Sequence, residues 1–144
     1  MKRRLFFGGA TAMIVAAIIF GIITIGGPRE ARRDAFDRQR YDDLKQISSA
    51  LFCSNWRILQ PVLPDALTLE NIRAYCGGIQ IDADVLVDNE TGTPYTYSRI
   101  TESTYAVCAT FHDAEKAMRQ SYQRLGQVNA SFNPETGCVT GRVR

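Results

Sequence analysis

The stretch LFFGGATAMIVAAIIFGIITIGG, residues 5–27, is one uninterrupted apolar run, and the organisation of the rest of the chain depends on it. It contains no charged residue. In a helix that rises about 1.5 Å per residue it would span roughly 30 Å, the thickness of the hydrocarbon core of a bilayer. We therefore expect a basic tail at residues 1–4, a transmembrane helix at residues 5–27 and one folded domain at residues 28–144.

A cleaved signal peptide is the alternative for this run. Signal peptides have an apolar core of about 7–15 residues and a cleavage site with small residues. Here the apolar run is longer, and Pro28, Arg29 and Glu30 follow it directly. The pattern therefore favours an uncleaved anchor in contact with the lipid bilayer.

Small residues recur along the run at the spacing of a helix face. Such residues let a second helix approach closely, which would allow packing against other transmembrane subunits. The alternative is that Gly and Ala are simply common in membrane helices, and the sequence does not separate the two. The candidate packing positions are Gly8, Ala12 and Ala16, with Ala17 and Gly21 on a neighbouring stripe.

The formal charge of +2 does not describe the domain, because three basic residues precede the apolar run. The other 14 basic residues are matched by all 15 acidic ones, so the domain is nearly neutral. A neutral domain argues against nucleic acid as a partner. Its roughly 110 residues suffice for one modest core, in the size range where disulfides often supplement packing.

The chain contains four cysteines, an even number at wide spacings, without the C-x-x-C pairs that zinc sites usually show. Two disulfides are favoured over a metal site, and disulfides persist in oxidising compartments. Four thiols permit three pairings, of which we favour Cys53 with Cys76 and Cys108 with Cys138.

The orientation of the anchor follows from two opposing signals. Basic residues flank the run on both sides, with more of them after it, so a count of charges alone would place the domain in the cytoplasm. Long domains cross membranes largely regardless of flanking charge, and the cysteines favour an oxidising space. We expect a cytoplasmic N-terminus and a periplasmic, extracytoplasmic domain on the inner (cell) membrane.

Three helices are predicted in the domain. The segment Arg29 to Cys53 contains no Gly or Pro, so we expect it to form one long helix. We expect the first turns of this helix to form a solvated or headgroup-facing stalk. A short helix is capped by Asp65 and ends at Cys76, before Gly77 and Gly78; another runs from Asp113 to Leu125, before Gly126. The apolar face of the long helix consists of Phe36, Leu44, Ile47 and Leu51.

The strands are predicted from β-branched and aromatic residues between turns. Residues 79–87 form a short strand or extended loop, and residues 88–92 form a turn. Residues 94–100 and 104–111 form a hairpin through residues 101–103. A short edge strand, Cys138 to Thr140, follows a turn at residues 133–137.

The order of these parts resembles the type IV pilin-like, or pseudopilin-like, architecture. The segment DNETGTPYTY, residues 88–97, looks like the acidic-Gly-x-Pro-Tyr-x-Tyr motif that opens a pseudopilin strand, and YAVCATF, residues 105–111, looks like the following strand. The resemblance covers residues 5–111 and implies an α+β fold. In it, the transmembrane helix continues into a long amphipathic helix (residues 28–53) packed on a small antiparallel sheet (core, residues 54–111). Residues 112–144 lie outside the resemblance, and we expect them to form a C-terminal arm.

The chain lacks the Glu that prepilins carry near the start of the apolar helix, and this bears on which of two functions is expected. A prepilin carries Glu at the fifth mature position, and with Gly9 as the last leader residue that position is Ile14. The departure favours an accessory subunit of an integral membrane complex over a minor component of a type II secretion or type IV pilus system. A tethered periplasmic module that binds a small ligand is a further alternative.

Some pseudopilins bind calcium near the Gly turn, so the resemblance points to a set of oxygen ligands. The alternative, which we favour, is a polar turn whose side chains accept local backbone hydrogen bonds. The candidate ligands are Asp82, Asp84, Asp88, Asn89 and Glu90. No cofactor is predicted.

Catalysis is not predicted. His112 is the only histidine, and a surface or loop position is favoured for it over a catalytic one. The chain contains no Gly-rich phosphate loop, nucleophile elbow or redox C-x-x-C motif. Five aromatic residues could line a ligand groove, although a place in the core is favoured: Trp56, Tyr75, Tyr95, Tyr97 and Tyr105.

Overall fold

The computed structural model describes residues 11–21, 27–53, 57–60, 62–121 and 129–143. This part of the chain combines helices, antiparallel strands and two disulfides, which confirms the predicted α+β class. The chain forms two compact units, residues 1–33 and residues 34–144. We call the second unit the head.

The predicted membrane span falls only partly within the described residues, because residues 5–10 and 22–26 lie outside them. Residues 11–21 form a helix that includes four of the candidate packing positions, while Gly8 lies outside the described residues. Large apolar side chains on this helix are exposed, with Met13 at 76%, Ile14 at 61% and Phe20 at 69%. Within the described ranges, no helix combines the length and the apolar character needed to cross a membrane.

Helix α2 spans Pro28–Phe52, within a residue of the prediction at each end. Proline at the first helical position loses no hydrogen bond, and no Gly or other Pro interrupts the helix. Leu44, Ile47 and Leu51 are fully buried, as predicted. Phe36 is only half-buried, and Asp37 and Arg40 turn inward instead, which corrects the predicted apolar face.

A four-stranded antiparallel sheet has the order β3-β4-β6-β5, formed by β3 (Thr96–Arg99), β4 (Thr104–Cys108), β5 (Ala130–Asn133) and β6 (Cys138–Arg142). The predicted hairpin is confirmed as β3 and β4. Strand β6 was predicted at an edge, and this is wrong, because it pairs with both β4 and β5. Strand β5 was not predicted, since Phe132 is its only large apolar residue.

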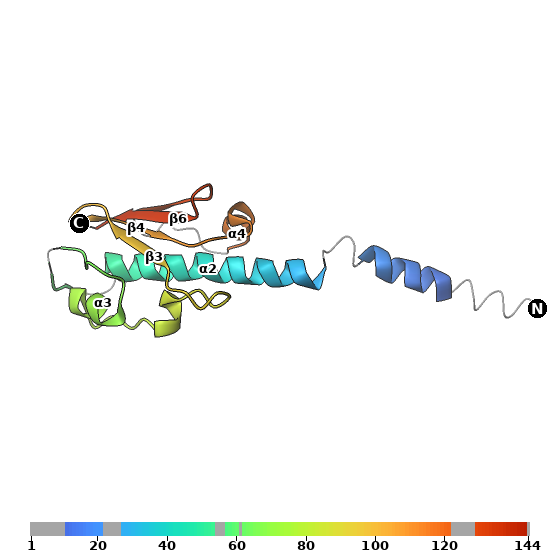
Figure 1. Ribbon diagram of the computed structural model, residues 1–144, viewed down its shortest axis with the longest axis horizontal. Coiled ribbons are helices and arrows are strands. Elements are labelled where there is room, and N and C mark those ends of the chain that lie inside the picture. Colours follow the sequence, from blue (N-terminus) through green and yellow to red (C-terminus); the bar gives the residue numbers. More distant parts are fainter. Residues whose placement is uncertain (1–10, 22–26, 54–56, 61, 122–128, 144) are drawn as a thin grey trace, which may run out of the picture. The chain divides into compact units, whose positions relative to one another are not determined.

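The inner face of the sheet packs on α2, and α3 (Leu69–Tyr75) lies on the other side of α2 in the view of Figure 1. The Tyr105 hydroxyl donates to the backbone oxygen of Ser48 on α2 at 3.4 Å. The rings of Tyr41 and Phe132 meet edge to face with centroids 5.0 Å apart. Gly141 makes this packing possible, because a Cβ at that position would collide with the ring of Tyr105. The core therefore lies between the sheet and the buried side of α2.

The segment between α2 and the sheet differs from the prediction in two places. Helix α3 is capped by Thr68, whose hydroxyl accepts from the backbone N–H of Asn71, rather than by Asp65. For residues 79–87 a short strand or an extended loop was expected; the strand is wrong, residues 79–82 are irregular, and a 3-10 turn, η1 (Ala83–Leu86), follows. The neighbouring residues Val85 and Leu86 are both buried, which a strand with alternating faces would not allow.

The last helix, α4 (Ala114–Gln120), is capped by Asp113 as predicted, but it ends five residues before Leu125 because the backbone is extended at Ser121. Leu125 and Gly126 lie outside the described residues. The chain after α4 is part of the sheet through β5 and β6, so residues 130–142 are not a separate arm.

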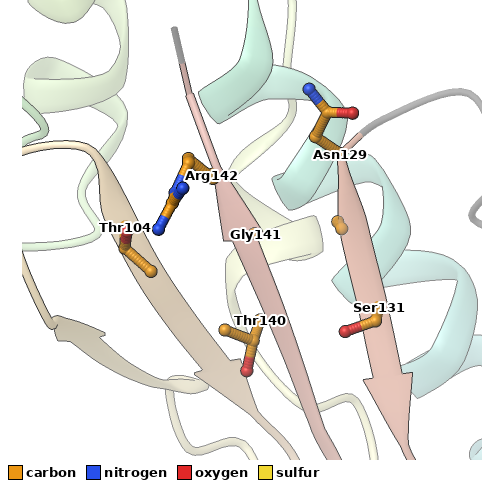
Figure 2. A pocket seen from close by; sticks show the side chains of 7 residues that line it. Thr104, Asn129, Ser131, Thr140, Gly141 and Arg142 are labelled. Carbon is orange, nitrogen blue, oxygen red and sulfur yellow. The ribbon is translucent and has the colours of Figure 1, made fainter.

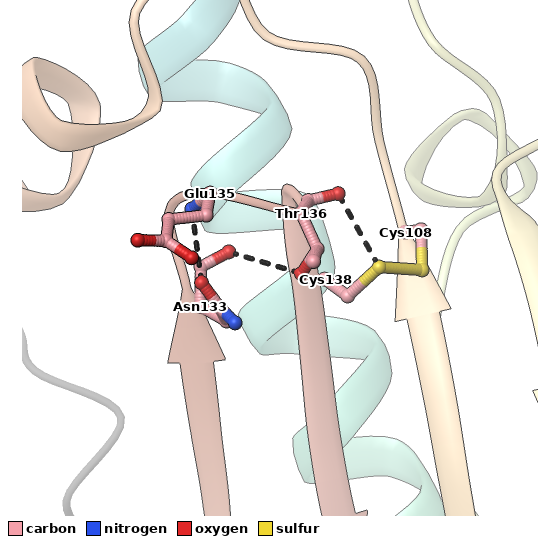
Figure 3. The surroundings of a disulfide bond; sticks show 5 residues. All are labelled: Cys108, Asn133, Glu135, Thr136 and Cys138. Carbon is pink, nitrogen blue, oxygen red and sulfur yellow. Dashed lines mark hydrogen bonds between the residues drawn. A yellow bond between two sulfur atoms is a disulfide. The ribbon is translucent and has the colours of Figure 1, made fainter.

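Both predicted disulfides are confirmed. Cys53–Cys76 joins the residue after α2 to β2 (Cys76–Gly77), which pairs with β1 (Arg57–Ile58). Cys108–Cys138 joins directly opposed residues of β4 and β6, beside the turn at residues 133–137 (Figure 3). The disulfides therefore fix the end of α2 and one end of the two central strands of the sheet.

Candidate functional site

A buried charge network is the main concentration of ionisable groups in the described part of the head. Arg40 lies at its centre, with a residue exposure of 3%. Its guanidinium contacts Asp37 on the same helix (Nη1 to Oδ1, 2.8 Å) and both carboxylate oxygens of Asp88 (2.8 and 3.2 Å). It also contacts Glu90 (Nη2 to Oε2, 2.5 Å). The planar fork of arginine suits such a set of carboxylates.

The turn at residues 88–92 positions two of these carboxylates, those of Asp88 and Glu90, against α2. The Asp88 side chain accepts from the backbone N–H groups of Glu90 (2.8 Å) and Thr91 (3.4 Å). Gly92 closes the turn with a φ of +71°, a conformation that favours glycine. The acidic turn at residues 88–92 is therefore stabilised by the Asp88 side chain, and it binds α2 through Arg40.

Asp37 connects the network to α4. Its carboxylate accepts from the backbone N–H groups of His112 (3.1 Å) and Asp113 (2.7 Å). The His112 ring lies at the rim, with Nε2 2.9 Å from Oε2 of Glu90. One helix, one turn and the beginning of α4 are thus held together by polar contacts.

The network keeps its groups charged. Burial acts to raise the pKa of Asp88, but hydrogen bonds from Arg40 and from the Glu90 backbone outweigh it, so this pKa lies below its ordinary value. Hydrogen bonds from His112 and Arg40 lower the pKa of Glu90. Burial alone would lower the pKa of Arg40, yet its carboxylate partners raise it overall. Each carboxylate stabilises the cation, and the cation stabilises them.

The five candidate calcium ligands are not brought together. Asp88 and Glu90 face Arg40, whereas Asp82, Asp84 and Asn89 are exposed. Within the described ranges, no group of three or more His, Cys, Asp or Glu residues is arranged to hold a metal ion. The local hydrogen bonds of Asp88 match the polar-turn alternative.

A second buried pair lies one turn further along α2. Asp43 is 5% exposed, and its Oδ2 accepts from the Tyr95 hydroxyl at 2.8 Å. Burial raises the pKa of Asp43 to about 6, the Tyr95 hydrogen bond opposes this, and the charges of Asp42 and Asp84 add to it. Asp43 is therefore a buried carboxyl that takes up a proton at mildly acidic pH.

The four aromatic candidates among the described residues belong to the core or pack against it. Tyr75 and Tyr105 are 1% exposed and Tyr95 is 6% exposed, so all three belong to the core. The half-buried Tyr97 donates to the backbone oxygen of Pro64 at 2.8 Å, and Trp56 lies outside the described residues.

A shallow depression lies on the face of the sheet that is turned away from α2. Figure 2 shows short polar side chains around it, together with Arg142. Its volume is about 420 Å³. The residues that line it do not include a nucleophilic side chain next to a general base. They are Thr104, Asn129, Ala130, Ser131, Thr140, Gly141 and Arg142. The depression offers hydrogen bonds but no catalytic set.

Sequence reasoning gave Arg40 no structural or functional role, whereas the structure places it in the core of the head. One signal could have identified it. Asp37, Arg40 and Leu44 follow one another at spacings of three and four residues, so they share the face of α2 that enters the core.

Comparison of the chain with known protein families, with curated proteins and with solved structures finds no match in any of the three.

Proposed function

We propose that this chain is a single-pass membrane-anchored structural protein that acts through protein contacts. The observation that carries the proposal is the uncharged run at residues 5–27, together with the exposure of large apolar side chains on the helix at residues 11–21. Met13 and Phe20 have more than two-thirds of their area exposed, and lipid is the solvent in which such a surface is stable.

The polar architecture of the head supports contact rather than chemistry. Arg40, Asp37 and Asp88 are buried and pair with one another inside the head, and Glu90 adds a contact at the surface. Among the described residues, every buried side-chain nitrogen or oxygen has a hydrogen-bond partner. A head with this organisation is suited to present a rigid surface, as an accessory subunit of an integral membrane complex does.

A minor pseudopilin-like component of a secretion or pilus system is the second candidate. The packing of α2 against an antiparallel sheet, and the turn that opens into β3, favour it. The residue at the fifth position after Gly9 is Ile14 rather than Glu, and this favours the accessory subunit. We therefore place the accessory subunit first.

Two cross-links in a small head support an extracytoplasmic location. The test is to extract membranes of expressing cells with alkaline carbonate and to label intact cells with an impermeant maleimide, before and after reduction. We expect the chain to stay in the pellet and to be labelled only after reduction. Release by carbonate would contradict the anchor, and labelling only after lysis would contradict the location.

The partner class is tested by purifying the chain in mild detergent and identifying copurifying subunits by mass spectrometry. We expect subunits of one integral membrane complex in a fixed ratio. Recovery of a secretion ATPase with pseudopilins would instead establish the second candidate.

A further inference from the structure

The disulfide between Cys108 and Cys138 lies on the face of the sheet that is turned away from the core. The two residues are directly opposed in the central strands β4 and β6, with their Cα atoms 4.0 Å apart. Their neighbours Val107 and Val139 are fully buried, so the alternation along each strand turns both cysteines to the opposite face, where they are partly exposed. Figure 3 shows the bond beside the turn at residues 133–137.

The residues paired with the two cysteines on the outer strands leave the sulfur atoms accessible. Thr96 of β3 is paired with Cys108, and Asn133 of β5 is paired with Cys138. Both have short polar side chains, and both are exposed. The other disulfide, by contrast, is buried in the core. Thiol–disulfide exchange requires a thiolate to reach a sulfur atom, so the bond on the sheet face is the one that a second protein can reach while the head is folded.

Contacts other than the disulfide hold β4 and β6 together. The two strands share five register pairs, and beyond them the backbone N–H of Val143 donates to the backbone oxygen of Ser103 at 2.8 Å. At the disulfide end, the backbone N–H of Ala109 donates to the backbone oxygen of Gly137 at 3.0 Å. Gly137 lies so close that a Cβ there would collide with the backbone oxygen of Ala109. We therefore expect the two thiols of a reduced head to stay opposed on the sheet.

We propose that Cys108–Cys138 is a site of reversible thiol–disulfide exchange with a protein that carries a dithiol. A thiolate of the partner attacks one sulfur of the pair, so that an S–S bond forms between the two proteins, the Cys108–Cys138 bond breaks and the displaced cysteine takes up a proton from water. The partner's second thiol loses its proton, attacks the partner's own sulfur in the mixed disulfide and displaces the other cysteine, which is protonated in turn. Two electrons have then passed from the partner, now a disulfide, to the head, now a dithiol.

The opposed placement of the cysteines selects a dithiol over a monothiol as the partner. After the first attack, the displaced thiolate is held opposite the mixed disulfide, so it attacks back and expels the partner. A partner with one thiol is expelled before a second such molecule arrives. A partner with two thiols resolves the mixed disulfide within the complex, in competition with this return reaction.

The test incubates the oxidised full chain in detergent with reduced thioredoxin as the protein dithiol, or with reduced glutathione at the same thiol concentration. Thiols are blocked with a maleimide at successive times and assigned by peptide mass mapping, while circular dichroism monitors the fold. We expect thioredoxin to open Cys108–Cys138 and to leave Cys53–Cys76 closed, with cooperative unfolding retained. Glutathione should leave both bonds closed, and an excess of oxidised thioredoxin should close Cys108–Cys138 again.

The control variant is Cys108→Ser/Cys138→Ser, which lacks the bond. Because other contacts hold the two strands, we expect this variant to unfold cooperatively, and we expect thioredoxin to release no thiol from it. An unfolded variant would show that the sheet requires the bond, which would overturn the proposal.

The unmodified chain gives the decisive results. If thioredoxin leaves Cys108–Cys138 closed, or if opening the bond abolishes cooperative unfolding, the bond is a structural cross-link only. If glutathione opens it as readily as thioredoxin does, the partner is not specifically a protein dithiol. The inference uses only residues of the head, so release of the chain from membranes by carbonate would reject the anchor and leave this proposal standing.

Discussion

At the scale of single residues, Arg40 is the centre of the buried charge network in the head. Its charge is compensated by Asp37, Asp88 and Glu90, of which the first two are buried. Replacing one partner of a buried ion pair leaves the others uncompensated, and this costs more than the pair contributes.

We predict that Arg40→Ala lowers the free energy of unfolding by about 3–5 kcal/mol, because two buried carboxylates lose their cation. The measurement is urea unfolding of the full chain in detergent, monitored by circular dichroism. The control is Arg38→Ala, an exposed arginine two positions away, which should change stability by no more than about 0.5 kcal/mol. Equal effects of the two substitutions would contradict the role assigned to the network.

Asp43 leads to a second prediction at this scale. Burial raises its pKa to about 6 from an ordinary value of 3.8, so between these values the folded state binds more protons than the unfolded state. Stability therefore rises as the pH falls from 7 toward 4, by up to about 3 kcal/mol. Asp88 and Glu90, whose pKa values are lowered, act in the opposite direction, and their contribution is lost only at lower pH.

The measurement is the urea midpoint at pH 7.5 and pH 5 for the unmodified chain and for Asp43→Asn. The oxygen of the substituted amide would still accept a hydrogen bond from the Tyr95 hydroxyl. We therefore expect Asp43→Asn to be more stable than the unmodified chain at pH 7.5. Its stability should differ much less between pH 7.5 and pH 5 than that of the unmodified chain. A pH dependence that persists in the variant would assign it to other groups.

At the scale of elements, the two disulfides differ in their surroundings. Cys53 and Cys76 are 5% and 0% exposed, at the end of α2. Cys108 and Cys138 are partly exposed on the face of the sheet away from α2 (Figure 3). Thiol–disulfide exchange requires a thiolate to reach a sulfur atom, so access decides which bond reacts first.

We predict that dithiothreitol without denaturant reduces Cys108–Cys138 first and that Cys53–Cys76 reacts only when the head unfolds. The measurement is alkylation at successive times, followed by peptide mass mapping. The same time course in urea is the control and should remove the difference. Earlier alkylation of Cys53 and Cys76 in the folded protein would contradict this order.

At the scale of the whole molecule, the hydrophobic core of the described residues lies entirely within the head, between Tyr41 and Val143. The helix at residues 11–21 contributes no residue to this core. We therefore expect the stability of the head not to depend on the helix at residues 11–21.

We predict that residues 28–144 produced alone fold with both disulfides and with an unfolding midpoint within a few degrees of that of the full chain in detergent. The measurement is thermal unfolding by circular dichroism, with a thiol count on the native protein. A truncated chain with free thiols or without a cooperative transition would show that the apolar run takes part in folding.

Contacts that form only in the folded chain account for the features that sequence reasoning missed. The burial of Arg40 depends on Asp88 and Glu90, which lie 48 and 50 residues further along the chain. The central position of β6 depends on β5, a strand with little apolar patterning. The 3-10 turn at Ala83–Leu86 arises because two consecutive side chains both fit into the core. The partners of Arg40 are therefore far from it in sequence, whereas β5 and β6 are joined by the short turn at residues 133–137.

The sequence by itself determined α2 and the β3–β4 hairpin, because helical periodicity and β-branched composition act between residues that are close along the chain. It favoured one of three disulfide pairings, and the structure confirms that pairing. Only the tertiary structure decided that Asp37 and Arg40 enter the core, that β6 lies at the centre of the sheet and that the acidic turn binds a guanidinium. These features depend on the free energy of contacts between distant segments, which exist only once the chain has folded.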